Sequence, residues 1–282
     1  MTGRDIALTG VPRSGTTLAC QLLNQCADTI ALFEPMDPAG VPATSLGACV
    51  DHVQAFMAAT RLQVLASGTA PSKQQHGAVP DNLFARADAH GVRAAQAAPG
   101  TIAATARDAG FTLVVKHNAM FAAALPALAP RIDTFAIVRN PLAVLGSWNS
   151  VDLPVRNGRI PAGERLDPAL GARLDAEPDR LERQLIVLDW FFSRFATQLP
   201  RAHVLPYESI VASHGRLLFD CLHVDGPHGR ALEERNASAA YGRDDIDRCA
   251  RALHARAGAW DAWYPREAIA ALHARMSGAA RP

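Results

Sequence analysis

The stretch of residues 10–17, Gly-Val-Pro-Arg-Ser-Gly-Thr-Thr, concentrates groups that bind anions. It has the G-x-x-x-x-G spacing of a phosphate-binding loop, but Thr16 stands where a nucleotide triphosphatase carries its lysine. Backbone N–H groups at a helix N-terminus, reinforced by the helix dipole, attract phosphate or sulfate. The alternative is a glycine turn that only joins a strand to a helix. The density of donors favours an anion site, to which we assign Pro12, Arg13, Ser14, Gly15, Thr16 and Thr17.

Three further candidate side chains each follow a run of apolar residues. Glu34 follows residues 30–33, and Pro35 predicts an extended backbone at Glu34. Lys116 and His117 follow residues 111–115. Side chains alternate along a strand, so we expect only one of these two to point at a given atom. A solvated carboxylate and a surface lysine are the structural alternatives for Glu34 and Lys116.

Arg139 and Ser147 form another candidate pair. Arg139 directly follows the apolar run 134–138. Ser147 lies in a predicted helix, and Pro141 suits the first turn of that helix. Both can reach the oxygens of one phosphate, since arginine and hydroxyl donors bind such oxygens well. An arginine that pairs with a structural carboxylate is the alternative, and the sequence does not choose between the two.

These candidates need a scaffold that brings strand ends together. Apolar runs at 6–8, 30–33, 111–115, 134–138 and 202–206 are interrupted by segments with helical spacing. That alternation predicts an α/β fold: a P-loop-type parallel sheet flanked by helices, in a single domain spanning residues 1–282. The strands' carboxyl ends face the ligand crevice in such sheets, which places the candidate residues at one edge.

Two segments interrupt this pattern. Residues 36–110 predict a helical insertion, with helices at 46–66 and 84–97 separated by a polar loop at 68–82. Residues 151–180 are rich in proline, glycine and arginine, and predict a lid or acceptor loop. Further helices are expected at residues 179–199, 213–223, 244–257 and 265–276.

Composition narrows the class of protein. The chain has 282 residues, 49% of them hydrophobic, and a formal net charge of +1, so we expect one sizeable core and no nucleic-acid partner. Its five cysteines include no C-x-x-C, and its histidines lack paired ligand spacing, so we expect free thiols and no metal. The N-terminal residues do not read as a signal peptide, and no apolar run approaches the roughly 20 residues of a membrane span. We expect a cytoplasmic protein.

Taken together, the motifs resemble the sulfotransferases that use 3′-phosphoadenosine 5′-phosphosulfate, most closely the tyrosylprotein sulfotransferase branch. Residues 10–18 are similar to the family's 5′-phosphosulfate loop, and Arg139 with Ser147 to its 3′-phosphate pair. Tyr207-Glu208 resembles a Y-E segment at the nucleotide. Glu34 and Lys116 match the catalytic glutamate and the strand-end lysine. The resemblance covers residues 5 to 210.

The resemblance implies roles for these residues. Glu34 would be the general base, while Arg13 and Lys116 would hold the sulfonate and the bridging oxygen. Tyr207 would contact the nucleotide and Ser238 would lie near the sulfuryl group. His117 is the rival base, because cytosolic sulfotransferases use a histidine shortly after the same lysine. The reaction requires no metal.

The chain departs from the family pattern in two places. Val151 stands where the branch has an arginine, for which Arg156 or Arg159 are possible substitutes. The R-K-G loop of the cytosolic enzymes is absent, which leaves nucleotide contacts from residues 225–245 open.

Other classes of function stay open as well. A P-loop kinase or ATPase is one, and a nucleotide-binding protein without catalytic activity is another. The acceptor hydroxyl could belong to a small molecule or to a peptide, and the sequence does not indicate an oligomeric state.

Overall fold

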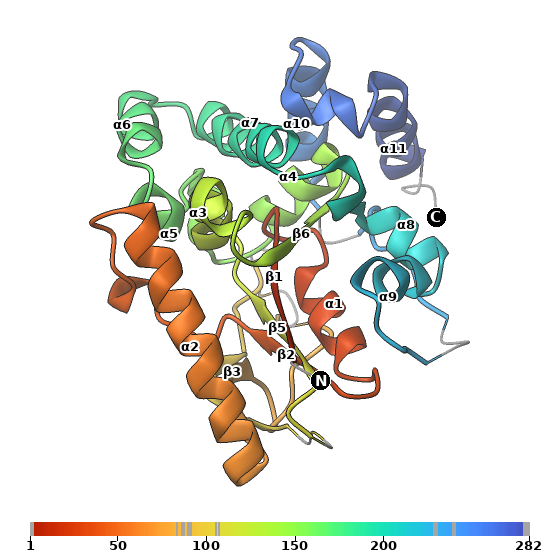
Figure 1. Cartoon of the computed structure of the whole chain (residues 1–282). Coiled ribbons are helices and arrows are strands. Elements are labelled where there is room, and N and C mark those ends of the chain that lie inside the picture. The colour runs from red at the N-terminus through yellow and green to blue at the C-terminus, as the bar shows by residue number, and fades with distance from the viewer. Residues whose placement is uncertain are drawn as a thin grey trace.

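Five strands that run in the same direction form the centre of the molecule, shown as a computed structural model in Figure 1. The structure describes residues 3–278 except 83, 86–87, 89–91, 105, 107, 228–230 and 239–240. In spatial order the strands are β2 (Thr29–Phe33), β5 (Thr112–Lys116), β1 (Arg4–Gly10), β6 (Asp133–Val138) and β7 (Val204–Pro206). The predicted α/β fold with a parallel sheet flanked by helices is confirmed, and all five strands lie where the apolar runs predicted them.

The register of the sheet brings strand ends to a common level. Lys116, the last residue of β5, pairs with Leu8 of β1 on one side and with Phe33 of β2 on the other. Gly10, where the anion-binding loop begins, pairs with Ile137 of β6. The groups that follow these residues therefore share the carboxyl edge of the sheet, where open α/β sheets bind ligands.

Helices cover both faces of the sheet, as the fully buried strand interiors require. In Figure 1, α1 (Thr16–Leu23), α8 (Tyr207–Ala212) and α9 (Arg216–Leu222) lie on one side, and α2 (Leu46–Ser67) and α3 (Ala119–Leu128) on the other. A second part of the core is built by α4 (Pro141–Asn149), α7 (Arg180–Gln198), α10 (Arg243–His254) and α11 (Arg266–Gly278). The helices predicted between residues 179 and 276 are confirmed, with ends shifted by a few residues. Across the described part of the chain, no helix is long and apolar enough to cross a membrane.

The insertion is only partly helical. The predicted helix at 46–66 is α2, which Ser45 caps by accepting a hydrogen bond from the Ala48 N–H at 3.1 Å. The chain then forms β3 (Thr69–Gln74), which pairs with β4 (Ala98–Ala103) in an antiparallel ribbon. The prediction of a loop at 68–82 was therefore wrong for residues 69–74, which form β3.

The helix predicted at 84–97 is also wrong for the described residues of that range. Phe84 pairs with Ala95 in an antiparallel bridge, and Arg93 pairs with Val151 in a parallel one. Alanine favours a helix by less than 1 kcal/mol per residue over most residues, and tertiary pairing of the backbone outweighs that preference here.

The segment 151–180 consists of short helices rather than a long irregular loop. It contains η2 (Pro154–Asn157), α5 (Pro161–Glu164) and α6 (Pro168–Ala176), each with proline in its first turn. The Arg165 Nη1 donates to the carbonyl oxygens of Pro38 and Val41, the first at 2.9 Å. Pro38 belongs to η1 (Pro38–Gly40), which follows β2. The segment 151–180 is therefore joined to the segment that follows β2. The remaining short helices are η3 (Arg201–His203) and η4 (Ala259–Ala262).

Candidate functional site

A cavity of about 440 Å³ opens at the carboxyl edge of the sheet. This is within the usual size of small-molecule sites, roughly 300–1,000 Å³. Most of the side chains singled out from the sequence line it: Pro12, Arg13, Gly15, Thr16, Thr17, Glu34, Lys116, Arg139, Tyr207 and Ser238. Segments far apart in the chain thus meet at one place, as the strand-end argument predicted.

The glycine loop is held by contacts to its neighbours. The Ser14 hydroxyl donates to the Ile137 carbonyl at 2.7 Å, and the Trp148 indole donates to the Pro12 carbonyl at 2.8 Å. Ser14 is fully buried, so its side chain shapes the loop instead of facing the cavity. Gly15 has φ of +94° and lies against the Tyr207 ring, where an added Cβ would come within 2.6 Å of a ring carbon. Only glycine fits that position without strain.

Glu34 lies between two lysines. One carboxylate oxygen accepts from the Lys116 ammonium and the other from the Lys73 ammonium, each at 2.7 Å. The Glu34 side chain is 24% exposed, whereas that of Lys116 is 2% exposed. Glu34 has φ of +43°, so the extended backbone expected from Pro35 was wrong. The two charge-assisted hydrogen bonds help to offset this unfavourable conformation.

The lysines control the acidity of Glu34. Burial by itself would raise the pKa of this carboxyl, but the positive charges of Lys116 and Lys73 outweigh burial and hold the pKa far below its usual range. Glu34 is therefore ionised at neutral pH, and it is a weak base while both lysines contact it.

His117 is directed away from Lys116, as strand alternation predicted. Its Nε2 accepts a hydrogen bond from the Met36 N–H at 3.3 Å, and its ring packs 5.2 Å from that of Phe121. Burial lowers the pKa of His117 to about 3. The imidazole is thus neutral with its proton on Nδ1, and Nε2 is engaged by the backbone.

Ser147 pairs with Arg13 rather than with Arg139. The Arg13 Nε donates to the Ser147 hydroxyl at 3.1 Å, and the guanidinium lies 4.1 Å from the centre of the Phe84 ring. Burial, and after it the positive charge of nearby Arg93, lowers the pKa of Arg13 to about 9. A cation in this environment gains most from an anionic ligand.

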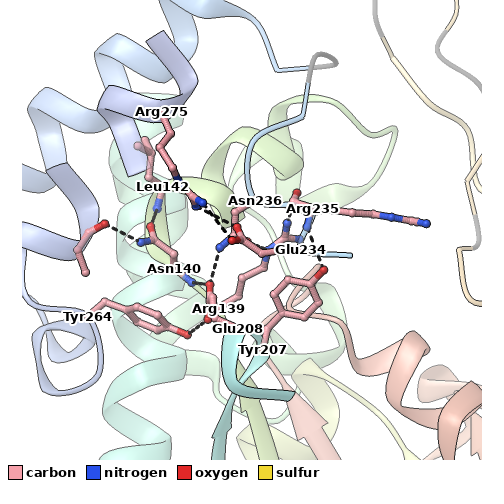
Figure 2. A network of polar contacts seen from close by, with 11 residues as sticks. Arg139, Asn140, Leu142, Tyr207, Glu208, Glu234, Arg235, Asn236, Tyr264 and Arg275 are labelled. Atoms are coloured by element: carbon pink, nitrogen blue, oxygen red, sulfur yellow. Dashed lines mark hydrogen bonds and ion pairs between the residues drawn. The ribbon is translucent and has the colours of Figure 1, made fainter. Parts of the chain in front are cut away.

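Arg139 is held in place by the segment that contains Asn236, as Figure 2 shows. Its Nε donates to the Asn236 side-chain oxygen at 2.6 Å, and its Nη1 donates to the Arg13 carbonyl at 2.9 Å. The guanidinium also lies 4.6 Å from the centre of the Tyr207 ring. A third hydrogen bond runs from Nη2 to the Arg235 carbonyl. Three of the five N–H groups of Arg139 are thus engaged, and two remain for a ligand.

Glu208 is the centre of the network in Figure 2. It accepts hydrogen bonds from the Asn236 amide at 2.8 Å, the Asn140 N–H at 3.0 Å and the Tyr264 hydroxyl at 2.7 Å. The glutamate of the Tyr207-Glu208 segment therefore positions Asn236, which in turn positions Arg139. Its role could not be read from the sequence, because its partners are separated from it along the chain.

Three cations of the cavity were missed by sequence reasoning: Lys73, Arg93 and Arg235. Lys73 and Arg93 come from the insertion, in stretches that carry no motif. Arg93 bridges to Val151, and its Nη2 donates to the Ser150 hydroxyl at 2.7 Å. Arg93 thus lies next to Val151, whereas Arg156 and Arg159 do not line the first cavity. Arg159 instead pairs with two carboxylates, those of Glu164 and Asp175.

A second cavity of about 200 Å³ adjoins the first. Glu34, Lys73 and Asn118 line both cavities. His117 lies on the wall of the second cavity, together with residues of η2 and α5. A carboxylate and an ammonium are thus accessible from both sides.

The first cavity has the charge of an anion site. Its described lining includes six basic side chains, Arg13, Lys73, Arg93, Lys116, Arg139 and Arg235. Three acidic side chains accompany them, Glu34, Asp81 and Glu233. This excess of positive charge, next to a helix N-terminus, suits a ligand with several phosphate or sulfate groups. Among the described residues, no cluster of three or more His, Cys, Asp or Glu side chains could hold a metal ion.

No protein-family model matches this chain, and a comparison with curated proteins finds no match.

Replacing Gly15 with alanine tests the fit of the loop against Tyr207. We expect Gly15→Ala to lower the free energy of unfolding by about 2–4 kcal/mol, because strain from positive φ is added to the clash. Gly68→Ala is the control, since Gly68 has φ of +63° but open space around its Cβ. Gly68→Ala should lower the free energy of unfolding by only about 1 kcal/mol, and urea titrations measure both variants. Equal losses in the two variants would contradict the clash.

The Glu34 ion pairs make stability depend on pH. The pKa of Glu34 is lower in the folded protein than its ordinary value of 4.5, so the pairs stabilise the fold above that pH. We expect Glu34→Gln to lower the free energy of unfolding by about 1.5–3 kcal/mol near pH 7. The difference should shrink as the pH falls below 4.5, because the wild type then loses this contribution.

Urea titrations at several pH values measure that difference. Glu267→Gln, at an exposed glutamate, is the control, and its effect should stay within about 0.5 kcal/mol. A Glu34→Gln deficit that does not change with pH would contradict the assigned pairing.

Proposed function

We propose that this chain is a sulfotransferase, which moves a sulfuryl group from 3′-phosphoadenosine 5′-phosphosulfate to an acceptor hydroxyl. The observation that carries the proposal is the position of Glu34. Its carboxylate lies at the boundary between a cationic cavity of nucleotide size and a smaller second cavity, in contact with Lys116 at 2.7 Å. A base and a cation meet where donor and acceptor would meet.

The donor fits the first cavity by charge. The loop amides and the N-terminus of α1 suit the 5′-phosphosulfate, as in other anion sites of this geometry. Because Arg13 contacts Ser147, we assign it to the 3′-phosphate together with Arg93 and Arg139, instead of to the sulfonate as expected from the sequence. Tyr207 lies beneath Arg139 and offers an aromatic face near the nucleotide. Ser238 lines the same cavity and would lie near the sulfuryl group.

The chemical step is an in-line displacement at sulfur. The acceptor oxygen forms a bond to sulfur as the bond between sulfur and the bridging oxygen breaks, and Glu34 takes the hydroxyl proton. The electron pair stays on the bridging oxygen of the product, 3′,5′-adenosine bisphosphate, where Lys116 stabilises it. The step needs no metal ion, because lysine and arginine carry the charge stabilisation.

Binding of the donor would also change Glu34. The sulfonate and the bridging oxygen compete for the Lys116 ammonium, which otherwise contacts Glu34. Weaker contact with Lys116 would raise the pKa of Glu34 toward the range in which a carboxylate is an effective base. The base would then become active only when the donor is in place.

His117 is the less suitable base. Its Nε2 is engaged by the Met36 N–H, and a pKa of about 3 makes it a poor proton acceptor at neutral pH. A P-loop kinase is disfavoured by Thr16, which replaces the lysine that such enzymes use to bind phosphate. The cysteines, which form no disulfide within the described residues, are consistent with the cytoplasm as the proposed location.

Nucleotide binding tests the donor assignment. We expect calorimetry to detect 3′,5′-adenosine bisphosphate with an affinity that does not change when magnesium is removed. Arg139→Met should weaken that binding by about 10- to 100-fold, since a charged hydrogen bond contributes about 1.5–3 kcal/mol. The same substitution should change the affinity for 5′-AMP, which lacks the 3′-phosphate, far less. Magnesium-dependent binding of ATP without bisphosphate binding would overturn the proposal.

Turnover with labelled donor tests the base. Glu34→Gln should lower kcat by about 100- to 10,000-fold, the usual contribution of a general base, while the bisphosphate still binds. His117→Ala should lower kcat by less than about 10-fold, in line with a packing role. If His117→Ala abolished turnover and Glu34→Gln did not, the two roles would be reversed. If neither the wild type nor either variant turns over the donor, although the bisphosphate binds, the chain is a non-catalytic nucleotide-binding protein.

A further inference from the structure

The second cavity has a polar end and an apolar remainder. Glu34, Lys73 and Asn118 are shared with the first cavity and mark the polar end. Beyond them the wall is mainly aliphatic, with Met36, Met120, Val155, Ile160 and Ala162. A molecule placed here would direct a polar group toward Glu34 and bury an apolar body against these side chains.

The charges around this cavity are already neutralised. Lys73 pairs with Glu34, and Arg159 pairs with Glu164 and Asp175. Among the described lining residues, Lys73 and Arg159 both contact carboxylates of the chain, so an anionic acceptor would have to compete with those carboxylates. This arrangement disfavours sulfated or uronic sugars and peptides rich in acidic residues.

Size limits the occupant further. A cavity of about 150 Å³ lined by aliphatic and aromatic groups holds a benzene molecule. The second cavity, at about 200 Å³, therefore has room for one ring with a small substituent or an alkyl chain of similar volume. Hydrogen bonds from Arg165, the residue after α5, to the Pro38 and Val41 carbonyls connect this wall of the cavity to η1.

One polar atom at the boundary lacks a partner. The Asn118 side-chain oxygen is buried and has no hydrogen-bond partner among the described residues. Buried polar atoms of this kind are usually satisfied by protein, water or ligand. Asn118 follows Lys116 by two positions and lines both cavities, which places a polar amide on the wall that Glu34 also lines.

We propose that the second cavity is the acceptor site and that the acceptor is a small, uncharged alcohol or phenol whose body is about one ring in size. This assignment rests on the sulfotransferase function proposed above. The hydroxyl lies between Glu34 and Asn118, and the apolar body contacts Met36, Met120 and Ala162.

A comparison of acceptors tests the proposal in the whole chain. With labelled donor, 4-methylphenol should be sulfated with a kcat/KM at least about 100-fold above that of galactose or an acidic tyrosine peptide. In the presence of saturating 3′,5′-adenosine bisphosphate, saturation-transfer NMR should also detect 4-methylphenol bound to the protein. The peptide or the sugar as preferred acceptor would overturn the assignment.

A variant that fills the cavity locates the site. Ala162→Phe should raise KM for 4-methylphenol by about 10- to 100-fold, because the burial of one ring contributes about 1.5–3 kcal/mol. Its affinity for the bisphosphate should not change. Ala172→Phe, at an exposed position of α6, is the matched control and should leave KM unchanged.

The outcomes separate the two proposals. If the wild type does not bind the bisphosphate, the sulfotransferase function fails and the acceptor assignment fails with it. If the bisphosphate binds but Ala162→Phe leaves KM unchanged, only the acceptor site is wrong. Should Ala162→Phe not fold, a 4-methylphenol NMR signal that persists when 4-butylphenol, which exceeds the size of the cavity, is added supports the site. Displacement by 4-butylphenol, or no NMR signal in the wild type, contradicts it.

Discussion

The ion pair between Glu34 and Lys116 joins the ends of two neighbouring strands, and the arrangement of the site depends on it. The parallel register places Phe33 beside Lys116, so the residue after β2 lies next to the last residue of β5. Lys116 is almost fully buried, and an unpaired ammonium in that position would be strongly destabilising. The carboxylate that compensates this charge is the same group that we propose as the base. Structural stability and chemistry therefore rest on one contact.

The insertion does more than cover the sheet, because it supplies two of the cations around the cavity. The β3–β4 ribbon carries Lys73 to the second oxygen of Glu34, and the bridge between Arg93 and Val151 brings a guanidinium near Arg13. Several like charges at this distance repel one another when no anion is present. A ligand with several negative charges would relieve that repulsion, which gives the free cavity a built-in preference for a polyanion.

Separate networks hold the two sides of the site. Beside the first cavity, Glu208 positions Asn236, and Asn236 positions Arg139. Beside the second cavity, Arg165 joins the segment after β2 to the segment after α5. Glu34 lies between these networks and belongs to the wall of both cavities. The contacts that support Arg139 and those that Arg165 makes share no residue, so a substitution in one network leaves the other in place.

The sequence by itself determined the strands of the parallel sheet, most helices and the edge at which the candidate groups meet. Long apolar runs and a glycine loop carry strong local signals, and the alternation of strands and helices leaves few ways to arrange them. Only the tertiary structure decided the partners. Lys73 and Arg93 have no motif, Ser147 contacts Arg13, and Glu34 has a positive φ that its sequence context disfavours. The reason is physical: ion pairs and bridges between distant segments depend on how the chain packs, and local propensities of less than about 1 kcal/mol per residue yield to them.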